Sequence, residues 1–222
     1  MSTWKYLKNS DLTKEQINIT TKSYDKNACL YAEEWEWSSK AQEVTRNDYL
    51  TPFIKNLNPG SNVMVVGCGT GRDILTLQDK GFHCLGIDSS KGMLEEAVRR
   101  GVVSPLIHSD ILKISLINSS LDAVLCDSAL EHIAKKNILK LKEKYYKALK
   151  IGGILLLRFR LGNDKVFMTK DDVGIRYYTS FSQEHLNKLF NNNGFVIMEE
   201  KKIKHLDNIR PPFYSLFFRK VR

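Results

Sequence analysis

The stretch VMVVGCGTGRD, from Val63 to Asp73, decides the fold. Four residues that favour β-strands run into glycines at the alternate positions 67, 69 and 71, and a helical pattern follows over residues 73–80. Alternate glycines let a backbone turn sharply and come close to whatever binds against it. In α/β sheets, ligands bind at the carboxyl ends of the strands. The stretch therefore predicts a first strand, a ligand-binding loop and a first helix.

Beyond this loop, short apolar runs alternate with helical patterns. Further strands are expected at residues 83–87, 102–107, 122–126 and 154–159, and helices at 91–100 and around 138–149. Such alternation favours a parallel sheet with helices on both faces. A helix expected over 182–193 precedes two strands, at 195–200 and 213–219, and their short connection makes this pair antiparallel. The predicted fold is a doubly wound, mostly parallel α/β sheet of seven strands with an antiparallel last strand.

Upstream of the loop, one helical stripe is aromatic. Tyr24, Ala28, Tyr31 and Trp35 fall at i, i+4, i+7 and i+11, which is the spacing of one face of a helix. A second helix is expected over residues 42–57, because Pro59-Gly60 follows as a stop signal. The stripe has two interpretations at this stage, ordinary core packing or contact with a ligand.

Composition narrows the class of protein. The chain has 222 residues, 42% hydrophobic and 27% charged, with a formal net charge of +9, which fits one globular domain. The polar start MSTWKYLKNS and the lack of a long apolar run predict a cytoplasmic protein without a membrane partner. Four cysteines without a CxxC pair argue against a metal site and against a disulfide framework. The lysines of residues 135–150 are interpreted as a solvated helix face rather than an RNA-binding surface.

Three ligands compete for the glycine loop. A triphosphate loop needs GxxxxGK[ST], but Arg72-Asp73 follow the last glycine here. A dinucleotide loop needs GxGxxG, and the third glycine arrives one residue early. The pattern GxGxG fits S-adenosylmethionine, whose methionine carboxylate can use amides at a helix N-terminus. Asp88, which ends the second strand, can accept hydrogen bonds from both ribose hydroxyls, and Asp110 is placed to accept from the adenine amino group.

Several motifs in order resemble one family. They are VVGCGTGRD, GIDSSKGMLEEA, HSDI, LDAVLCDSALEHI, LKIGGILLLRF, RYYTSFSQEHLNKLFNNNGF and FYSLFFRK, between about Tyr24 and Lys220. With them the chain resembles the class I S-adenosylmethionine-dependent methyltransferases of the compact small-molecule type. The resemblance implies the sheet order 3-2-1-4-5-7-6. It also implies one methyltransferase domain over residues 1–222, with an N-terminal helical lid at 1–45 and a Rossmann-like core at 46–222.

The same resemblance assigns the site residues. It implies cofactor-binding roles for Arg46, Gly67, Cys68, Gly69, Gly71, Asp88, Ser89, Asp110, Ile111, Asp127 and Ser128. On the acceptor side it points to His132 as a general base and to Tyr24, Tyr31, Arg158, Arg160, Tyr177 and Tyr178 as substrate-binding residues. One position departs from the family, because Val65 stands where an acid usually helps to hold the methionine ammonium group. Asp73 is interpreted as a residue that stabilises the helix start.

These features predict transfer of a methyl group to a small-molecule acceptor whose reacting atom the sequence does not specify. Two alternatives stay open. The first is methylation of a modified tRNA base, although DSAL at residues 127–130 is not the [DN]PP[YF] motif that stacks a flipped base. The second is a catalytically silent S-adenosylmethionine-binding module, which Val65 keeps under consideration.

Overall fold

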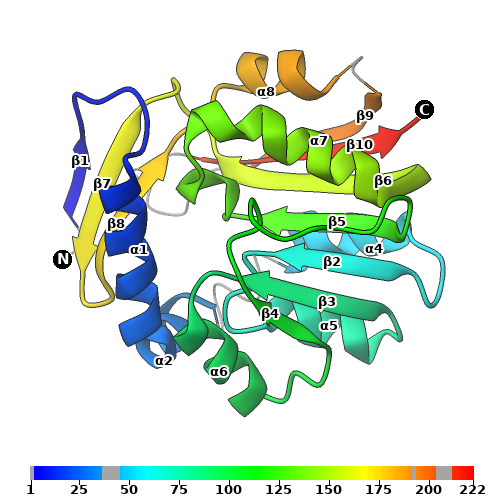
Figure 1. The fold of residues 1–222 in the computed structure, drawn as a ribbon, viewed down its shortest axis with the longest axis horizontal. Coiled ribbons are helices and arrows are strands. Elements are labelled where there is room, and N and C mark those ends of the chain that lie inside the picture. The colour runs from blue at the N-terminus through cyan, green and yellow to red at the C-terminus, as the bar shows by residue number, and fades with distance from the viewer. Residues whose placement is uncertain (1–2, 37–45, 192–193, 204–211) are drawn as a thin grey trace.

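A seven-stranded sheet forms the centre of the molecule (Figure 1). The computed structural model describes residues 3–36, 46–191, 194–203 and 212–222. From one edge of the sheet to the other, the strands are β4 (Leu106–His108), β3 (His83–Asp88), β2 (Asn62–Val66), β5 (Leu121–Asp127), β6 (Leu149–Arg160), β10 (Phe213–Lys220) and β9 (Phe195–Ile203). The first five are parallel, and β10 is antiparallel to both of its neighbours. Counted along the chain, this is the order 3-2-1-4-5-7-6, so the predicted fold class is confirmed.

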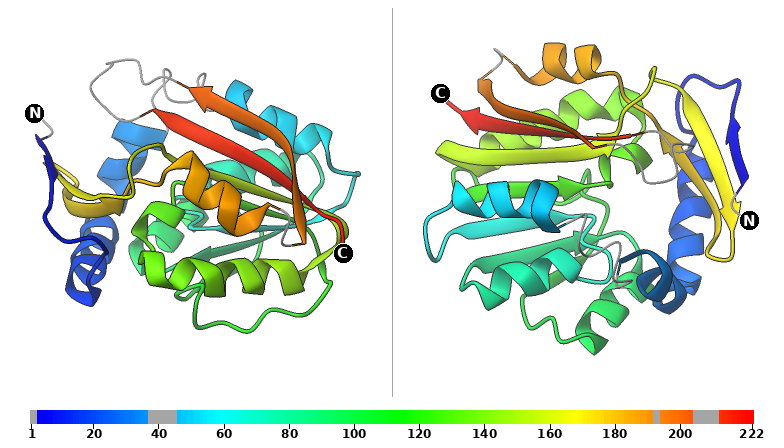
Figure 2. Two further views of the ribbon diagram at one scale, coloured as in Figure 1. Left: turned by 90° about the horizontal axis from the view of Figure 1, so that it is seen from above. Right: turned by 180° about the vertical axis from the view of Figure 1, so that it is seen from behind.

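Helices cover both faces of the sheet. Along β2, Met64 and Val66 point into one apolar layer, and Val63 and Val65 point into the other. The first layer packs against α7 (Ile138–Ala148) and α8 (Gln183–Phe190). The second packs against α4 (Thr51–Lys55), α5 (Arg72–Asp79) and α6 (Lys91–Arg99), which Figure 2 shows from behind. Burial on both faces explains why the central strands read as continuous apolar runs.

Two predicted elements differ from the structure. The third strand begins at Leu106 rather than at Val102, since Val102 packs instead in the helix layer beside Gly71. The preceding Pro105 has no N–H group for the sheet. The helix expected over 42–57 consists, in its described part, of a π-helical turn η2 (Arg46–Leu50) followed by α4, and residues 42–45 lie outside the described residues.

A second, three-stranded antiparallel sheet was not expected from the sequence. Its strands β1 (Thr3–Tyr6), β7 (Val166–Asp171) and β8 (Gly174–Thr179) pair in the order β1-β7-β8. Residues 3–6 therefore form a strand within the segment that was expected to be a helical lid. Four residues carry too little periodicity to predict a strand, and the partner of Thr3 is Lys170, far away in the sequence.

The small sheet and the N-terminal helices stand opposite the carboxyl ends of the central strands (Figure 1). A capping box between Thr13 and Gln16 starts α1 (Lys14–Lys26), which packs on β8. Ser23 Oγ donates to the carbonyl of Ile175 over 2.7 Å. The short helix α2 (Ala28–Tyr31) and a π-helical turn η1 (Ala32–Glu36) continue toward the glycine loop. This arrangement closes one side of the ligand-binding edge. Within the described residues, none of the helices has the length and apolar character that a membrane crossing needs.

Candidate functional site

A cavity of about 1150 Å³ lies at the carboxyl edge of the central sheet. Single ligand pockets usually measure about 300–1,000 Å³, so this one has room for two small molecules. Most of the predicted site residues line it: Tyr24, Tyr31, Gly67, Cys68, Gly69, Asp88, Ser89, Asp110, Ile111, Asp127, Ser128, His132, Arg158, Arg160 and Tyr178. Gly71 and Tyr177 do not line it, and the side chain of Arg46 lies outside the described part of the structure.

In the glycine loop, a side chain at position 67 or 71 would clash with neighbouring side chains. The amides of Gly67 and Cys68 both donate to the carbonyl of Ile87 at the end of β3, over 2.8 and 3.1 Å. Gly67 has a φ of 63°, and a Cβ there would lie 2.3 Å from the Cβ of Ala129. Gly71 instead lets α5 approach Val102. The first two glycines therefore expose backbone to the cavity, whereas the third serves packing.

Asp88 ties the loop to the end of β3. Its Oδ2 accepts from the amide of Gly69 and its Oδ1 from the amide of Ser90, each over 2.9 Å. Burial raises the pKa of this carboxyl from its usual value. Asp110, at the end of β4, accepts from the amide of Leu112 over 2.9 Å. Both acids face the cavity and still have lone pairs free of these backbone bonds.

A buried ionic network lies beside the glycine loop. Arg72 donates to the hydroxyl of Tyr49 over 2.9 Å, and that hydroxyl donates to Asp73 over 2.8 Å. Arg72 also lies 3.3 Å from Asp127, which accepts from Arg158 over 2.7 Å. Burial opposes ionisation of Asp127, but the two guanidinium groups outweigh it and hold its pKa below the usual value. Asp73 sits in the first turn of α5, as interpreted, and in addition belongs to this network.

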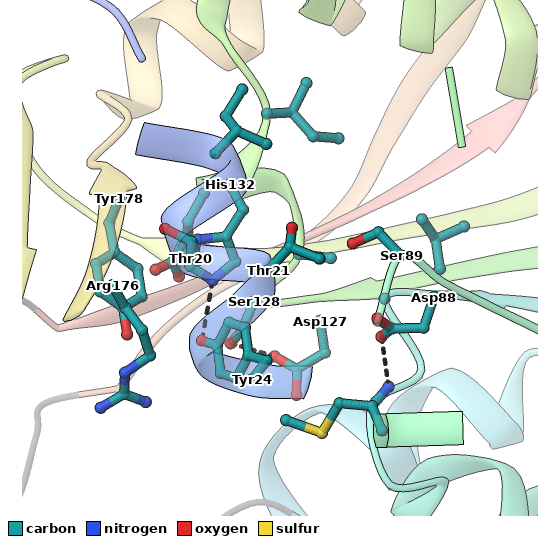
Figure 3. A pocket seen from close by; sticks show the side chains of 18 of the residues that line it. Thr20, Thr21, Tyr24, Asp88, Ser89, Asp127, Ser128, His132, Arg176 and Tyr178 are labelled. Atoms are coloured by element: carbon teal, nitrogen blue, oxygen red, sulfur yellow. Dashed lines mark hydrogen bonds between the residues drawn. The ribbon is translucent and has the colours of Figure 1, made fainter. Parts of the chain in front are cut away.

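His132 and Tyr24 form a pair at the other end of the cavity (Figure 3). His132 Nδ1 lies 2.8 Å from the backbone carbonyl of Tyr177, which can only accept, so Nδ1 carries the proton. His132 Nε2 lies 3.1 Å from the Tyr24 hydroxyl. Burial lowers the pKa of His132 to about 4. The ring is therefore neutral at pH 7, and its Nε2 accepts the hydrogen bond that Tyr24 donates.

This geometry gives an expected result for titration of His132. Nitrogen-15 NMR of the imidazole ring should show the Nδ1–H tautomer from pH 9 down to about pH 5, since its pKa is lowered to about 4. In the unfolded chain the imidazole ring becomes protonated near pH 6.5, whereas in the folded protein it does so only near pH 4. The contribution of His132 therefore lowers the free energy of unfolding as the pH falls from about 6.5 to about 4. The His132→Gln variant identifies the signal. A ring that titrates between pH 6 and 7 would contradict the buried pairing.

The N-terminal aromatic stripe faces the cavity. Tyr24, Tyr31 and Trp35 all line it, and the rings of Tyr24 and Tyr31 meet edge to face with centroids 5.2 Å apart. Farther along the same segment, Glu36 accepts a hydrogen bond from Thr70 of the glycine loop. Burial raises the pKa of Glu36 to about 7. The segment thus bridges the two ends of the cavity.

Hydrogen exchange can distinguish a lid from ordinary core. Amides of residues 23–36 should exchange more slowly with S-adenosylhomocysteine than without it, because the aromatic stripe then gains a surface to pack on. Helix α7, which packs on a sheet face away from the N-terminal segment, is the internal control and should be unaffected. Equal exchange of residues 23–36 in both states would assign the stripe to the core.

Some cavity residues were missed in the sequence. Arg72 lines the cavity and directly follows the glycine loop, so its place in the site could have been predicted from its position in the sequence alone. His108 lines the cavity and has its Nε2 3.0 Å from the carbonyl of Ser89. Trp4, Glu36 and Phe213 also line it; they come from segments that only the fold brings together. Among the described residues, no group of three His, Cys, Asp or Glu side chains could hold a metal ion.

Comparisons with known proteins agree with this fold. A methyltransferase-domain family profile matches residues 63–153, from β2 into β6. A carboxy-S-adenosyl-L-methionine synthase from Vibrio vulnificus (strain YJ016) is 31% identical over 115 residues, which are 47% of this chain and 45% of that protein. A putative methyltransferase, YqeM, from Bacillus subtilis (strain 168) is 30% identical over 115 residues, 49% of this chain and 47% of that protein. The chain spans about half the length, or less, of the curated relatives it matches first.

Solved structures share the architecture over most of the chain. A 1,6-didemethyltoxoflavin-N1-methyltransferase from Burkholderia thailandensis, crystallised with 1,6-didemethyltoxoflavin and S-adenosylhomocysteine, has a TM-score of 0.76 at 13% identity. The match covers 100% of this chain and 96% of that one. The PH0226 protein from Pyrococcus horikoshii OT3 has a TM-score of 0.71 at 15% identity, over 88% of this chain and 98% of that one. At these identities the likeness establishes the fold alone.

Proposed function

We propose that this chain is a class I S-adenosylmethionine-dependent methyltransferase that transfers a methyl group to a small-molecule acceptor; the methyltransferase-domain profile matched by residues 63–153 supports the family. One observation carries the proposal. A single cavity joins the glycine loop and Asp88 at one end with the pair of Tyr24 and His132 at the other. A donor site and an acceptor site in one cavity are what a group transfer needs.

The residues at the donor end suit S-adenosylmethionine. Gly67 and Gly69 bring backbone without a side chain to the cavity, and Asp88 and Asp110 offer acceptor oxygens to hydroxyl and amino groups. Ile111, buried beside them, offers an apolar surface to the adenine ring. Val65 has no charge to bind the cofactor's ammonium group. The carboxylates of Glu36 and Asp127, which also line the cavity, can bind it instead. When bound, the cofactor supplies a methyl group on an already activated sulfonium.

The acceptor end supplies a route for a proton. An acceptor hydroxyl or amine that donates to the Tyr24 oxygen can lose its proton to that oxygen, while the Tyr24 proton moves to His132 Nε2. His132 then becomes an imidazolium whose Nδ1–H still donates to the carbonyl of Tyr177. The aromatic side chains of the N-terminal segment line this end. Positioning of the two reactants supplies the remainder of the rate, of the order of 7–11 kcal/mol in favourable cases.

The proposal is tested by following a labelled methyl group. Purified protein is incubated with methyl-labelled S-adenosylmethionine and, separately, with the small-molecule fraction and with the RNA of a cell extract. Label in a small molecule is the expected result. Label in RNA would favour the tRNA alternative, and label in neither fraction despite tight cofactor binding would favour a catalytically silent module. Failure to bind the cofactor would overturn the proposal altogether.

A further inference from the structure

Three arginines with largely buried side chains lie along the cavity from the Asp127 network to the acceptor end. Arg158, Arg160 and Arg176 line it, and their side chains are 5%, 13% and 5% exposed. Each lies beside one carboxylate, namely Asp127, Glu131 and Asp171 respectively. The pairing leaves donors unused: Nε of Arg158, Nε and Nη1 of Arg160, and Nε of Arg176 are buried without a hydrogen-bond partner. Buried donors left unpaired are costly, which suggests that a ligand completes them.

Arg160 is the most weakly neutralised of the three. Its Nε lies 3.3 Å from Glu131 Oε2, whereas Arg158 lies 2.7 Å from its own carboxylate. The other oxygen of Glu131 is occupied, because Oε1 accepts from the backbone amide of Arg160 over 2.9 Å. Burial raises the pKa of Glu131 to about 7, so this carboxyl is ionised only in part at neutral pH. The positive charge of Arg160 is therefore only partly balanced by Glu131, and its Nη1 has no hydrogen-bond partner.

Aromatic rings frame that guanidinium. Its central carbon lies 4.5 Å from the ring centre of Phe213, 5.2 Å from that of Trp4 and 5.9 Å from that of Tyr178. All three rings line the cavity. Trp4 and Tyr178 are held in place by Phe167, which stacks on both at 5.0 and 4.9 Å. Flat walls around a guanidinium whose Nε and Nη1 form no hydrogen bond suit a planar anion, since a guanidinium binds a carboxylate through two parallel bonds.

Tyr178 connects this arginine to the proton route. Its ring centre lies 4.6 Å from that of His132, and Figure 3 shows His132 and Tyr24 on the side of Tyr178 that faces the donor end. A molecule about one ring long that lies on Tyr178 can therefore reach Arg160 with one end and the pair of Tyr24 and His132 with the other.

We propose that the methyl acceptor is a small planar organic acid whose carboxylate binds Arg160 and whose conjugated body packs on Tyr178 and Trp4. The atom that receives the methyl group is a hydroxyl or amine at the far end of the molecule, next to Tyr24. This inference rests on the proposed methyl transfer but specifies the class of acceptor.

Binding of probe acids tests the proposal without catalysis. Calorimetry in the presence of saturating S-adenosylhomocysteine compares 4-hydroxybenzoate and 4-aminobenzoate with their neutral amides. The wild-type protein should bind at least one acid about ten- to 100-fold more tightly than its amide, the range expected for hydrogen bonds to a charged group. The Arg160→Met variant should lose this preference and keep its affinity for S-adenosylhomocysteine. Lys136→Met, which removes a charge at an exposed position lining the same cavity, is the matched control and should keep the preference.

A second variant changes binding in the opposite direction. Gln at position 131 can still accept from the backbone amide of Arg160, but it removes the competing charge. Glu131→Gln should therefore tighten binding of the acids severalfold at pH 8 and leave binding of the amides unchanged, which a purely structural role for Arg160 would not produce.

If neither acid binds more tightly than its amide in the wild type, the acceptor class is wrong although the proposed methyl transfer stands. If S-adenosylhomocysteine itself does not bind, the proposed function fails first. Should Arg160→Met not fold, Arg160→Lys replaces it, with a smaller but measurable loss of the preference because the planar fork is gone.

Discussion

Replacing His132 with alanine is expected to lower the turnover of the proposed methyl transfer by about 10²–10⁴-fold, the usual contribution of a positioned general base. The reason is the paired geometry: His132 Nε2 is the unprotonated atom within hydrogen-bond distance of the Tyr24 hydroxyl. Cofactor affinity should hardly change, because the contacts of His132 are to Tyr24 and the Tyr177 carbonyl rather than to the glycine loop. Single-turnover kinetics with the identified acceptor, together with calorimetry for the cofactor, measures both quantities.

Two variants separate a base from a residue that only shapes the cavity. Gln at position 132 can donate to the carbonyl of Tyr177 and accept from Tyr24, but it is not basic. Phe at position 24 keeps the ring that meets Tyr31 and removes the hydroxyl. Both His132→Gln and Tyr24→Phe should lose turnover with little change in KM. Near-normal turnover of His132→Gln across pH 6 to 9 would exclude the base role and leave positioning as the source of the rate.

The central sheet could be predicted because its signals are local. Each strand of the pair β2 and β3 is a short apolar run that ends at a glycine or an acid, and Gly81 and Gly101 stop the helices that follow the two strands. The antiparallel end followed from the short connection between β9 and β10. The order of strands, in contrast, came from the family resemblance, since no single-sequence pattern states which strands are neighbours.

The walls of the acceptor end could not be predicted for a different reason. Trp4, Tyr178 and Phe213 belong to β1, β8 and β10, three strands in two different sheets. Their convergence depends on the pairing of β1 with β7 and on the packing of α1 on β8, contacts between residues more than 140 positions apart. Tyr177 illustrates the same limit. Its neighbour Tyr178 lines the cavity, while Tyr177 packs beside Leu12 and Val166 and contributes only its backbone carbonyl.

The carboxylates at the donor end of the cavity could also be identified only from the fold. The sequence suggested that Val65 leaves the loop without its usual acid, and the structure brings two other carboxylates to the same cavity. Glu36 arrives from the N-terminal segment and Asp127 from β5. Arg72 and Arg158 hold the pKa of Asp127 below its usual value, whereas burial raises the pKa of Glu36 to about 7, so of these two acids Asp127 is the one that stays charged below neutral pH. A departure at one position of a motif is therefore weak grounds for a silent module when the fold supplies charge from elsewhere.

Removing the carboxylate of Asp88 is expected to weaken binding of S-adenosylmethionine and its demethylated product by about 1.5–3 kcal/mol, or about ten- to 150-fold. The ribose hydroxyls would lose a charged acceptor. The structure adds a second cause, because Asp88→Ala also frees the amides of Gly69 and Ser90, which the carboxylate now holds at 2.9 Å. The two causes have to be separated before the ribose assignment is accepted.

Asp88→Asn separates them. An asparagine oxygen can still accept from one of the two amides, so the loop keeps part of its support, but the negative charge toward the ribose is gone. If Asp88 binds the ribose, Asp88→Asn should lose most of the cofactor affinity that Asp88→Ala loses. In addition, only the wild type should bind S-adenosylhomocysteine far more tightly than its 2′-deoxyribose analogue. Calorimetry measures the binding of both ligands to the wild type, Asp88→Ala and Asp88→Asn. Unchanged affinity in Asp88→Ala would exclude the ribose contact, and equal discrimination in wild type and Asp88→Asn would assign Asp88 to loop support alone.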